Sequence, residues 1–155
     1  MTGTPPQPGL EAAFEVDASL GPLEDHGTTR AGHRRVVPII GGQVHGMFDA
    51  EILPSGADWQ LVRPDGTVEI DTRYTARTPD GDYVHLRTSG VRSGPPHVLR
   101  ALLRGEAIDP SEYYFRVGLY LETAAPRLAW LQQSIFIASA IREADRVRYT
   151  AYRVT

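Results

Sequence analysis

The chain has 155 residues and contains neither cysteine nor lysine, so all sixteen basic residues are arginines. Without cysteine, the protein has no disulfide bond, no thiolate zinc site and no thiol nucleophile. Without lysine, it has no side-chain amine that forms a Schiff base. No apolar run approaches the roughly 20 residues that cross a bilayer. These absences leave hydroxyl groups, histidine, carboxylates, tyrosine and arginine for any catalysis.

The overall composition is that of an ordinary globular protein. Hydrophobic residues make up 41% and charged residues 23%, which excludes a disordered chain. The formal net charge of −3 does not favour nucleic acid as a partner. The N-terminus lacks the basic and apolar regions of a secretory signal. We therefore expect a cytoplasmic protein with no nucleic-acid or membrane partner.

Length and local composition predict the domain organisation. A chain of this length suits one domain. Residues 1–9 are rich in proline and glycine and predict a disordered leader, so the single domain spans residues 10–155.

Turn signals divide the chain into strand-sized segments. Pro-Ser-Gly, Pro-Asp-Gly and Gly-Pro-Pro sequences recur at short intervals. The Gly-rich and polar segment 21–35, with His26 and His33, is expected to be a loop. Glycines at 41, 42 and 46 predict a bend or close backbone packing. Two stretches, 97–106 and 125–133, favour short helices. The predicted strands are 10–20, 36–40, 59–63, 68–77, 83–89, 113–123, 135–142 and 147–155, which indicates an all-β sandwich or barrel.

The alternation within these strands separates two faces. In 68–77 the residues from Val68 to Ala76 with even numbers share one face, and Asp71 and Arg73 lie on the other. A hairpin symmetric about Asp65 and Gly66 would bring Asp58 close to the latter pair. Two interpretations remain open: surface salt bridges on a solvated sheet, or a polar cluster inside a barrel.

Motifs for established chemistries are missing. The sequence has no nucleophile elbow, no P-loop and no dinucleotide-binding glycine motif. Its five histidines occur singly, without the paired spacing of a metal site. We expect no metal and no other cofactor.

Four segments carry a family resemblance. They are Gly-Gly-x-Val-x-Gly at 41–46, the block at 56–81, Tyr-Tyr-Phe-Arg at 113–116 and the segment 130–142. Together they resemble the uncharacterised microbial family catalogued as domain of unknown function 3237, from about residue 10 to the C-terminus. The resemblance implies a small, mostly antiparallel β-barrel of the allene-oxide-cyclase and dirigent type, with one or two short helices. Proteins of that type hold a reactive intermediate in an apolar barrel mouth and steer its ring closure or coupling.

The resemblance favours the polar cluster inside the barrel over the surface interpretation. In such a cluster Asp58 and Asp71 are the candidate bases, because burial raises the pKa of a carboxyl group, and Tyr114 is the candidate proton donor. The predicted substrate-binding residues are Arg73, Arg116, Trp59, His45 and Arg142.

The predicted function is a cofactor-independent isomerase or cyclase acting on a small molecule. One alternative is a non-catalytic barrel that binds a small molecule or self-assembles through an exposed strand. A weaker alternative is a hydrolase or lyase that uses the same residues. Homo-oligomerisation is left open by the sequence.

Overall fold

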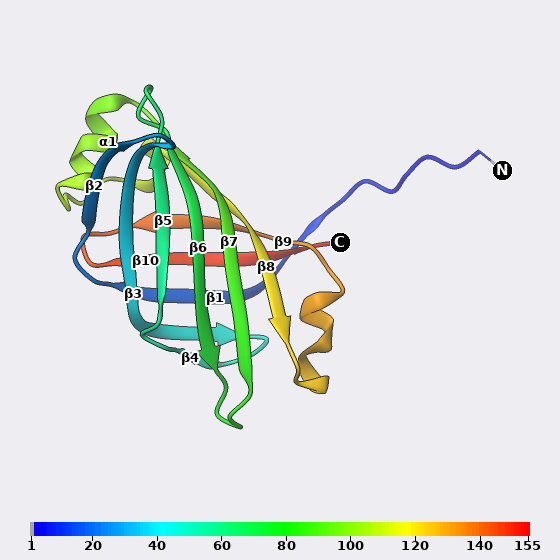
Figure 1. Cartoon of the computed structure of the whole chain (residues 1–155). Coiled ribbons are helices and arrows are strands. Elements are labelled where there is room, and N and C mark those ends of the chain that lie inside the picture. The colour runs from blue at the N-terminus through cyan, green and yellow to red at the C-terminus, as the bar shows by residue number, and fades with distance from the viewer. Residues whose placement is uncertain (1) are drawn as a thin grey trace.

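The computed structural model describes residues 2–155, and the elements of that part of the chain are shown in Figure 1. The strands are β1 (Leu10–Leu20), β2 (Glu24–Thr29), β3 (Gly32–Gly46), β4 (Ala50–Ile52), β5 (Gly56–Val62), β6 (Val68–Arg77), β7 (Tyr83–Ser93), β8 (Tyr114–Thr123), β9 (Phe136–Arg142) and β10 (Arg146–Val154). The helices are α1 (Pro96–Leu103) and the 3₁₀ helices η1 (Pro110–Glu112) and η2 (Pro126–Gln132).

Eight of the strands close into a barrel. In the order β1, β3, β5, β6, β7, β8, β9 and β10, each strand pairs antiparallel with the next, and β10 returns to β1. The short β4 lies between β3 and β6 at one end. This arrangement confirms the predicted antiparallel barrel. An eight-stranded barrel is just wide enough to be filled by side chains or to hold one small ligand.

The long strand β3 closes the barrel by changing partners. Its first part pairs with β5, and residues 41–46 pair with β1. Gly42 has a φ of +130°, and a Cβ added there would clash with the carbonyl oxygen of Asp17. Only glycine fits such a close approach without strain. The predicted bend and close backbone packing at these glycines are confirmed.

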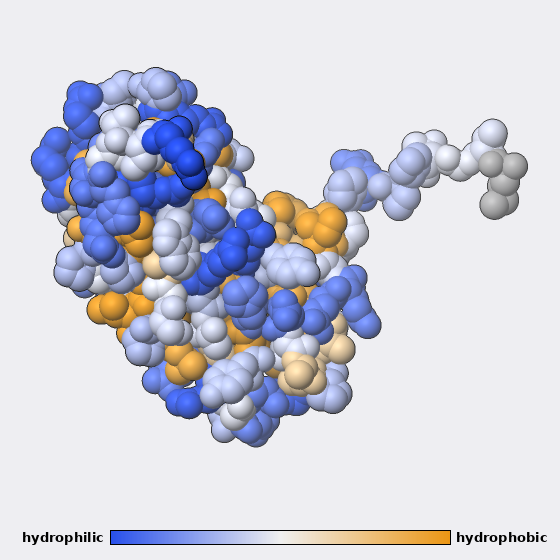
Figure 2. Space-filling view, viewed as in Figure 1, coloured by the Kyte–Doolittle hydropathy of each residue, from blue (hydrophilic) through white to orange (hydrophobic). Residues whose placement is uncertain are grey.

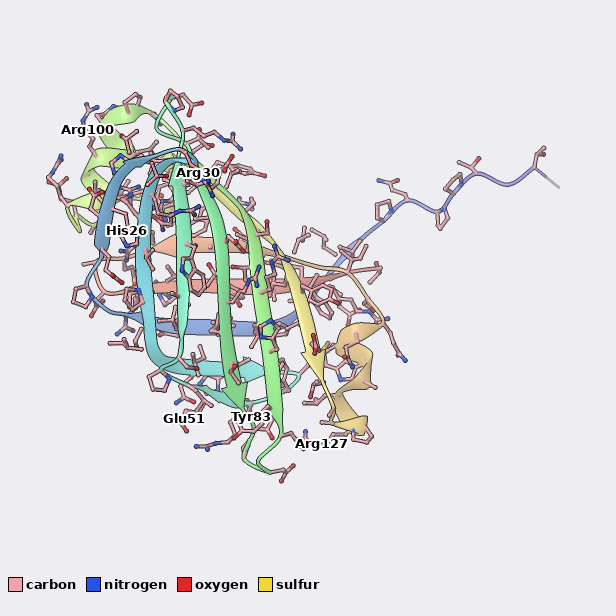
Figure 3. All side chains as sticks on the ribbon, viewed as in Figure 1. His26, Arg30, Glu51, Tyr83, Arg100 and Arg127 are labelled. Atoms are coloured by element: carbon pink, nitrogen blue, oxygen red, sulfur yellow. The ribbon has the colours of Figure 1, made fainter. Side chains whose placement is uncertain are left out.

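The loop predicted for residues 21–35 is wrong, because most of this segment forms the hairpin of β2 and β3. Its register shifts between Asp25 and Gly27, where the glycine has a φ of +74°. Strand β2 pairs only with β3, so its side chains are mostly exposed and need no apolar alternation. His26 lies on this edge strand (Figure 3). His33 lies at the start of β3.

Short helices cover the two ends of the barrel (Figure 1). Helix α1 buries Val98 and Leu102 in the hydrophobic core, and η2 buries Leu128 and Leu131. Both predicted helices are present, the second as a 3₁₀ helix. At the η2 end, Arg127 forms ion pairs of 3.2 Å and 3.1 Å with two aspartates of the β6–β7 turn, Asp80 and Asp82 (Figure 3).

None of the helices within residues 2–155 has the length and apolar character needed to cross a membrane.

Residues 2–9 extend away from the barrel (Figure 1), and Gly9 pairs with Thr155 through two backbone hydrogen bonds. The disorder expected of the leader stays a prediction. On the face shown in Figure 2, most residues are hydrophilic and hydrophobic residues occur in scattered areas.

Candidate functional site

A cavity of about 40 Å³ lies inside the barrel, toward the end where β7 leads into α1. All eight barrel strands contribute inward-facing side chains to its wall. Most of the wall is apolar, with a few convergent polar groups, which is the usual composition of a small-molecule site. A water molecule needs roughly 10–15 Å³, so the space holds a few waters or a small functional group. The polar residues of the wall are Asp58, Gln60, Thr72, Tyr74, Thr88, Arg92, Arg142 and Tyr149.

Asp58 of β5 is the only carboxylate in this wall, and it is 9% exposed. Its Oδ2 accepts a hydrogen bond of 2.8 Å from the side-chain amide of Gln60. Its Oδ1 accepts one of 3.1 Å from the backbone N–H of Asp71. Burial raises the pKa of Asp58, although these hydrogen bonds and the charge of Arg92 act against the shift. The carboxyl group is therefore fixed in orientation and poised to take a proton.

A tyrosine pair spans the barrel beside Asp58. Tyr74 of β6 and Tyr149 of β10 are hydrogen-bonded through their hydroxyl groups, and both line the cavity. Burial raises the pKa of each phenol. The pair therefore stays neutral at physiological pH and can donate a hydrogen bond or a proton to a ligand oxygen.

Two arginines supply positive charge to the same wall. Arg92 of β7 is 7% exposed, and its guanidinium lies 5.2 Å from the centroid of the Phe115 ring. Burial, together with the charge of Arg142, lowers the pKa of Arg92 to about 10, so it remains cationic at neutral pH. Arg142 of β9 is anchored by hydrogen bonds from Nη1 to the carbonyl oxygens of Glu143 and Ala144.

The hairpin register decides which predicted residues reach this cavity. A hairpin symmetric about residues 65 and 66 would pair Asp58 with Arg73, but in the structure Arg73 pairs with Ala57. The turn has three residues between Arg63 and Thr67, with Gly66 at a φ of +88°. A register change of one residue moves a side chain to the other face of the sheet.

The inward orientation predicted for Asp71 and Arg73 is consequently wrong. Both lie on the outer face of β6, where the Arg73 side chain is 53% exposed and its Nε is 4.0 Å from Asp71. Asp71 also lies 3.5 Å from Arg87. The surface salt-bridge interpretation is therefore correct for Asp71 and Arg73. Of the two candidate bases, only Asp58 faces the interior.

Four further predicted residues lie on the outside of the barrel. Tyr114 is 51% exposed, and its neighbour Arg116 points outward with its guanidinium 5.2 Å from the Tyr114 ring centroid. Trp59 is 40% exposed because it alternates with the inward Asp58 and Gln60 on β5. His45 is exposed and lies 3.5 Å from Asp49. The inward placement expected of Arg116 is wrong. Of the predicted set, Asp58 and Arg142 share the cavity.

Sequence reasoning missed the tyrosine pair and Arg92 as members of the site. Tyr74 stands in the mostly apolar row of β6, which is the buried one, whereas the prediction had turned the opposite row with Asp71 and Arg73 inward. Arg92 continues the inward positions of β7 beyond Gly90, past the predicted end of that strand at Ser89. No local sequence pattern indicates that Tyr74 and Tyr149 are in contact, because they are 75 positions apart.

Within residues 2–155 no three histidine or carboxylate side chains gather closely enough to hold a metal ion.

Comparisons with known proteins place the chain among similar sequences and folds. The model of the family described as "Protein of unknown function (DUF3237)" matches residues 8–154. A UPF0311 protein of Bradyrhizobium diazoefficiens is 40% identical over 91% of this chain and 93% of its own length. The crystal structure of a conserved protein of unknown function from Rhodopseudomonas palustris is 38% identical, has a TM-score of 0.92 and covers 98% of this chain and 100% of that one.

A more distant likeness concerns the fold alone. The crystal structure of an enzyme from Penicillium herquei has a TM-score of 0.71 over 100% of both chains, at 20% identity. The match over residues 8–154, together with the relative of 40% identity, shows that this chain belongs to the family Protein of unknown function (DUF3237).

Proposed function

We propose that the protein is a cofactor-independent enzyme that moves a proton on a small organic molecule inside the barrel, as an isomerase or cyclase. One observation carries the proposal: the carboxyl group of Asp58 and the Tyr74–Tyr149 pair line the same cavity. Burial raises the pKa of Asp58, which brings this base closer to neutral pH, where proton transfer is most effective.

The proposed step is a proton abstraction next to a carbonyl group. A carbon–hydrogen bond of the substrate breaks, its proton goes to Asp58, and the electron pair moves onto the carbonyl oxygen as an enolate. Neutral tyrosine hydroxyls and the positive charge of Arg92 stabilise that oxygen. Return of the proton from Asp58 to another atom completes an isomerisation. In a ring closure, the enolate attacks an electron-poor double bond of the same molecule, the π bond breaks as the new bond forms, and the resulting anion takes the proton back from Asp58.

The residue roles differ from those expected from the sequence. Asp58 keeps the role of base and Arg142 that of a substrate-binding residue. The buried tyrosine pair takes the role of Tyr114 as proton donor, and Arg92 takes the role of Arg73 and Arg116 in holding negative charge. The outward positions of the replaced residues are the reason for this reassignment.

A similar barrel is compatible with catalysis, because the Penicillium herquei protein of TM-score 0.71 is described as an enzyme. At 20% identity this likeness concerns the fold and leaves the reaction open. The chemistry proposed for this chain therefore depends on its own residues.

The test is the exchange of carbon-bound hydrogen for deuterium in 2,4-pentanedione, followed by NMR in D₂O. This small dicarbonyl compound has an acidic carbon–hydrogen bond between two carbonyl groups. We expect the wild type to accelerate exchange above the buffer rate. Asp58→Asn should lower the protein-dependent rate by about 10²–10⁴-fold, the usual contribution of a positioned base.

Asp71→Asn is the matched control for this experiment. It makes the same chemical change on the outer face of the neighbouring strand, and its backbone N–H still donates to Asp58. We expect its exchange rate to equal that of the wild type. No acceleration by the wild type, or an equal loss in both variants, would count against Asp58 as the base.

The small cavity favours one second candidate, a non-catalytic barrel that binds a small group. Its volume of about 40 Å³ is well below the roughly 300–1,000 Å³ of drug-sized ligand pockets. A binding module would retain a ligand in the cavity without any Asp58-dependent exchange. The deuterium experiment therefore separates the two candidates.

A further inference from the structure

The interior of the barrel, toward the end where β7 leads into α1, holds more positive than negative charge. Arg35 of β3 and Arg92 of β7 are each 7% exposed, and Arg142 lies on β9 beside them. Their charges act on one another and on Asp58. Three buried or partly buried guanidinium groups thus share the influence of one carboxyl group, and burial raises the pKa of that group, which weakens its negative charge further. Buried charges are normally paired, so this excess calls for a counter-charge.

The arginines are not neutralised by ion pairs with Asp58. The ion pairs of residues 2–155 involve other arginines and the histidines at the surface, and none includes Arg35, Arg92 or Arg142. Asp58 accepts its hydrogen bonds from Gln60 and the backbone of Asp71 instead.

Arg92 is the arginine that faces both the cavity and an aromatic ring, since it lines the cavity with its guanidinium 5.2 Å from the centroid of the Phe115 ring. The Nε of Arg35 is buried without a hydrogen-bond partner. By contrast, Arg142 donates to backbone carbonyl oxygens. Buried donors without acceptors are costly, and an acceptor placed in the cavity would remove that cost.

Carboxylates outside the cavity compensate part of the positive charge of Arg35 and Arg142. Asp25 acts on Arg35, and Asp145 acts on Arg142, and both carboxylates are exposed. The carboxylate with the main effect on Arg92 is Asp58. The uncompensated charge is therefore centred on Arg92, at the cavity.

We propose that the cavity binds the negatively charged group of an organic acid, either a carboxylate or an ionised enol, against the guanidinium of Arg92. Arg142 and Arg35 add to the positive electrostatic potential at this position. A guanidinium presents donors in a planar fork that matches two carboxylate oxygens. The inference rests on the proposed function in one respect: the bound anion is part of the molecule on which Asp58 acts.

The test compares acetate with acetamide, two molecules of nearly equal shape that differ in charge. Each is titrated into the full-length protein at constant pH and ionic strength. We read the ring NMR signals of Tyr74, Tyr149 and Phe115, and the midpoint of thermal unfolding. Acetate should shift these signals saturably and raise the midpoint, because a ligand bound to the folded state stabilises it. Acetamide at the same concentrations should do neither.

Arg92→Gln and Arg87→Gln form the matched pair of variants. Arg87 lies on the same strand but points outward, where its side chain is 46% exposed. Arg92→Gln should weaken acetate binding about 10–100-fold, the effect of losing a charge-assisted hydrogen bond. Arg87→Gln should bind acetate like the wild type. The proposal is overturned if acetate fails to bind, if acetamide binds equally well, or if Arg92→Gln keeps the full affinity.

If Arg92→Gln does not fold, the wild-type comparison of acetate with acetamide still tests whether the cavity prefers an anion to a neutral molecule of the same shape. The result is also separable from the proposed function. Acetate binding without deuterium exchange would leave an anion-binding barrel that is not this enzyme. Exchange without a preference for acetate would leave the enzyme and remove the anion site.

Discussion

The backbone N–H of Asp71 donates a hydrogen bond of 3.1 Å to the side chain of Asp58, although the two side chains lie on opposite faces of the barrel wall. Asp58 faces the cavity and is 9% exposed. Asp71 faces solvent beside Arg73 and Arg87. Two residues of the same type thus occupy opposite environments one strand apart, and only the inner one can meet a ligand in the barrel.

Burial of Asp58 should make stability depend on pH in a defined direction. Because burial raises the pKa of Asp58, the folded protein holds this proton more tightly than the unfolded chain. The resulting stabilisation is complete below the unfolded pKa of about 4 and is lost as the pH rises through the folded pKa. The free energy of unfolding of the wild type should therefore fall relative to that of Asp58→Asn over this range. Urea titrations at several pH values check this, and a difference that is constant or rises with pH would contradict it.

The tyrosine pair should show strong coupling in a double-mutant cycle. Tyr74→Phe leaves the hydroxyl of Tyr149 buried without its partner, which should cost about 1–3 kcal/mol of unfolding free energy. Tyr149→Phe should cost a similar amount. The double variant removes both hydroxyls and should be less destabilised than the sum of the two singles. Denaturant unfolding measures the cycle, and strict additivity would show that the hydrogen bond does not couple the two residues.

The partner change in β3 should make Gly42 intolerant of a side chain. Gly42→Ala combines a φ of +130° with a clash against the Asp17 carbonyl, and should cost about 3 kcal/mol or more. Gly81→Ala is the control, since Gly81 has a φ of +90° but no atom within 4 Å of the added Cβ. It should cost only about 1–2 kcal/mol. Equal losses in the two unfolding measurements would mean that the close approach to β1 is unimportant.

The outward position of Arg73 should make its removal harmless. Its side chain is 53% exposed and only 4.0 Å from Asp71, so Arg73→Ala should change the free energy of unfolding by less than about 1 kcal/mol. A residue of a buried ion pair would instead cost about 3–5 kcal/mol. A loss of that size in urea unfolding would place Arg73 in a buried cluster, contrary to the structure.

The sequence was sufficient to predict the barrel and most of its strands. The alternation from Val68 to Ala76 and the glycines at 41 and 42 are local signals, and the structure confirms both. The polar hairpin of β2 was mistaken for a loop because an exposed edge strand carries no apolar alternation.

The site was harder to predict because its residues depend on register and closure. Asp58 and Asp71 were expected on the same face of the sheet. They lie on opposite faces because the turn after Arg63 has three residues instead of two. The meeting of Tyr74 with Tyr149 follows from the closure of the barrel through β10, β1 and β3, which no local pattern encodes. The family resemblance favoured a polar cluster inside the barrel, but of the residues predicted for that cluster only Asp58 and Arg142 line the cavity.

A ¹³C NMR titration of the Asp58 carboxyl group measures the protonation of the proposed base itself and needs no substrate. We expect a pKa above the ordinary aspartate value of about 3.9, since burial disfavours the charged form. In Arg92→Gln the pKa should rise further, because the charge of Arg92 favours the ionised carboxylate. A pKa at or below the ordinary value in the wild type, or no response to Arg92→Gln, would contradict the assignment of Asp58 as a buried base facing the arginine-rich cavity.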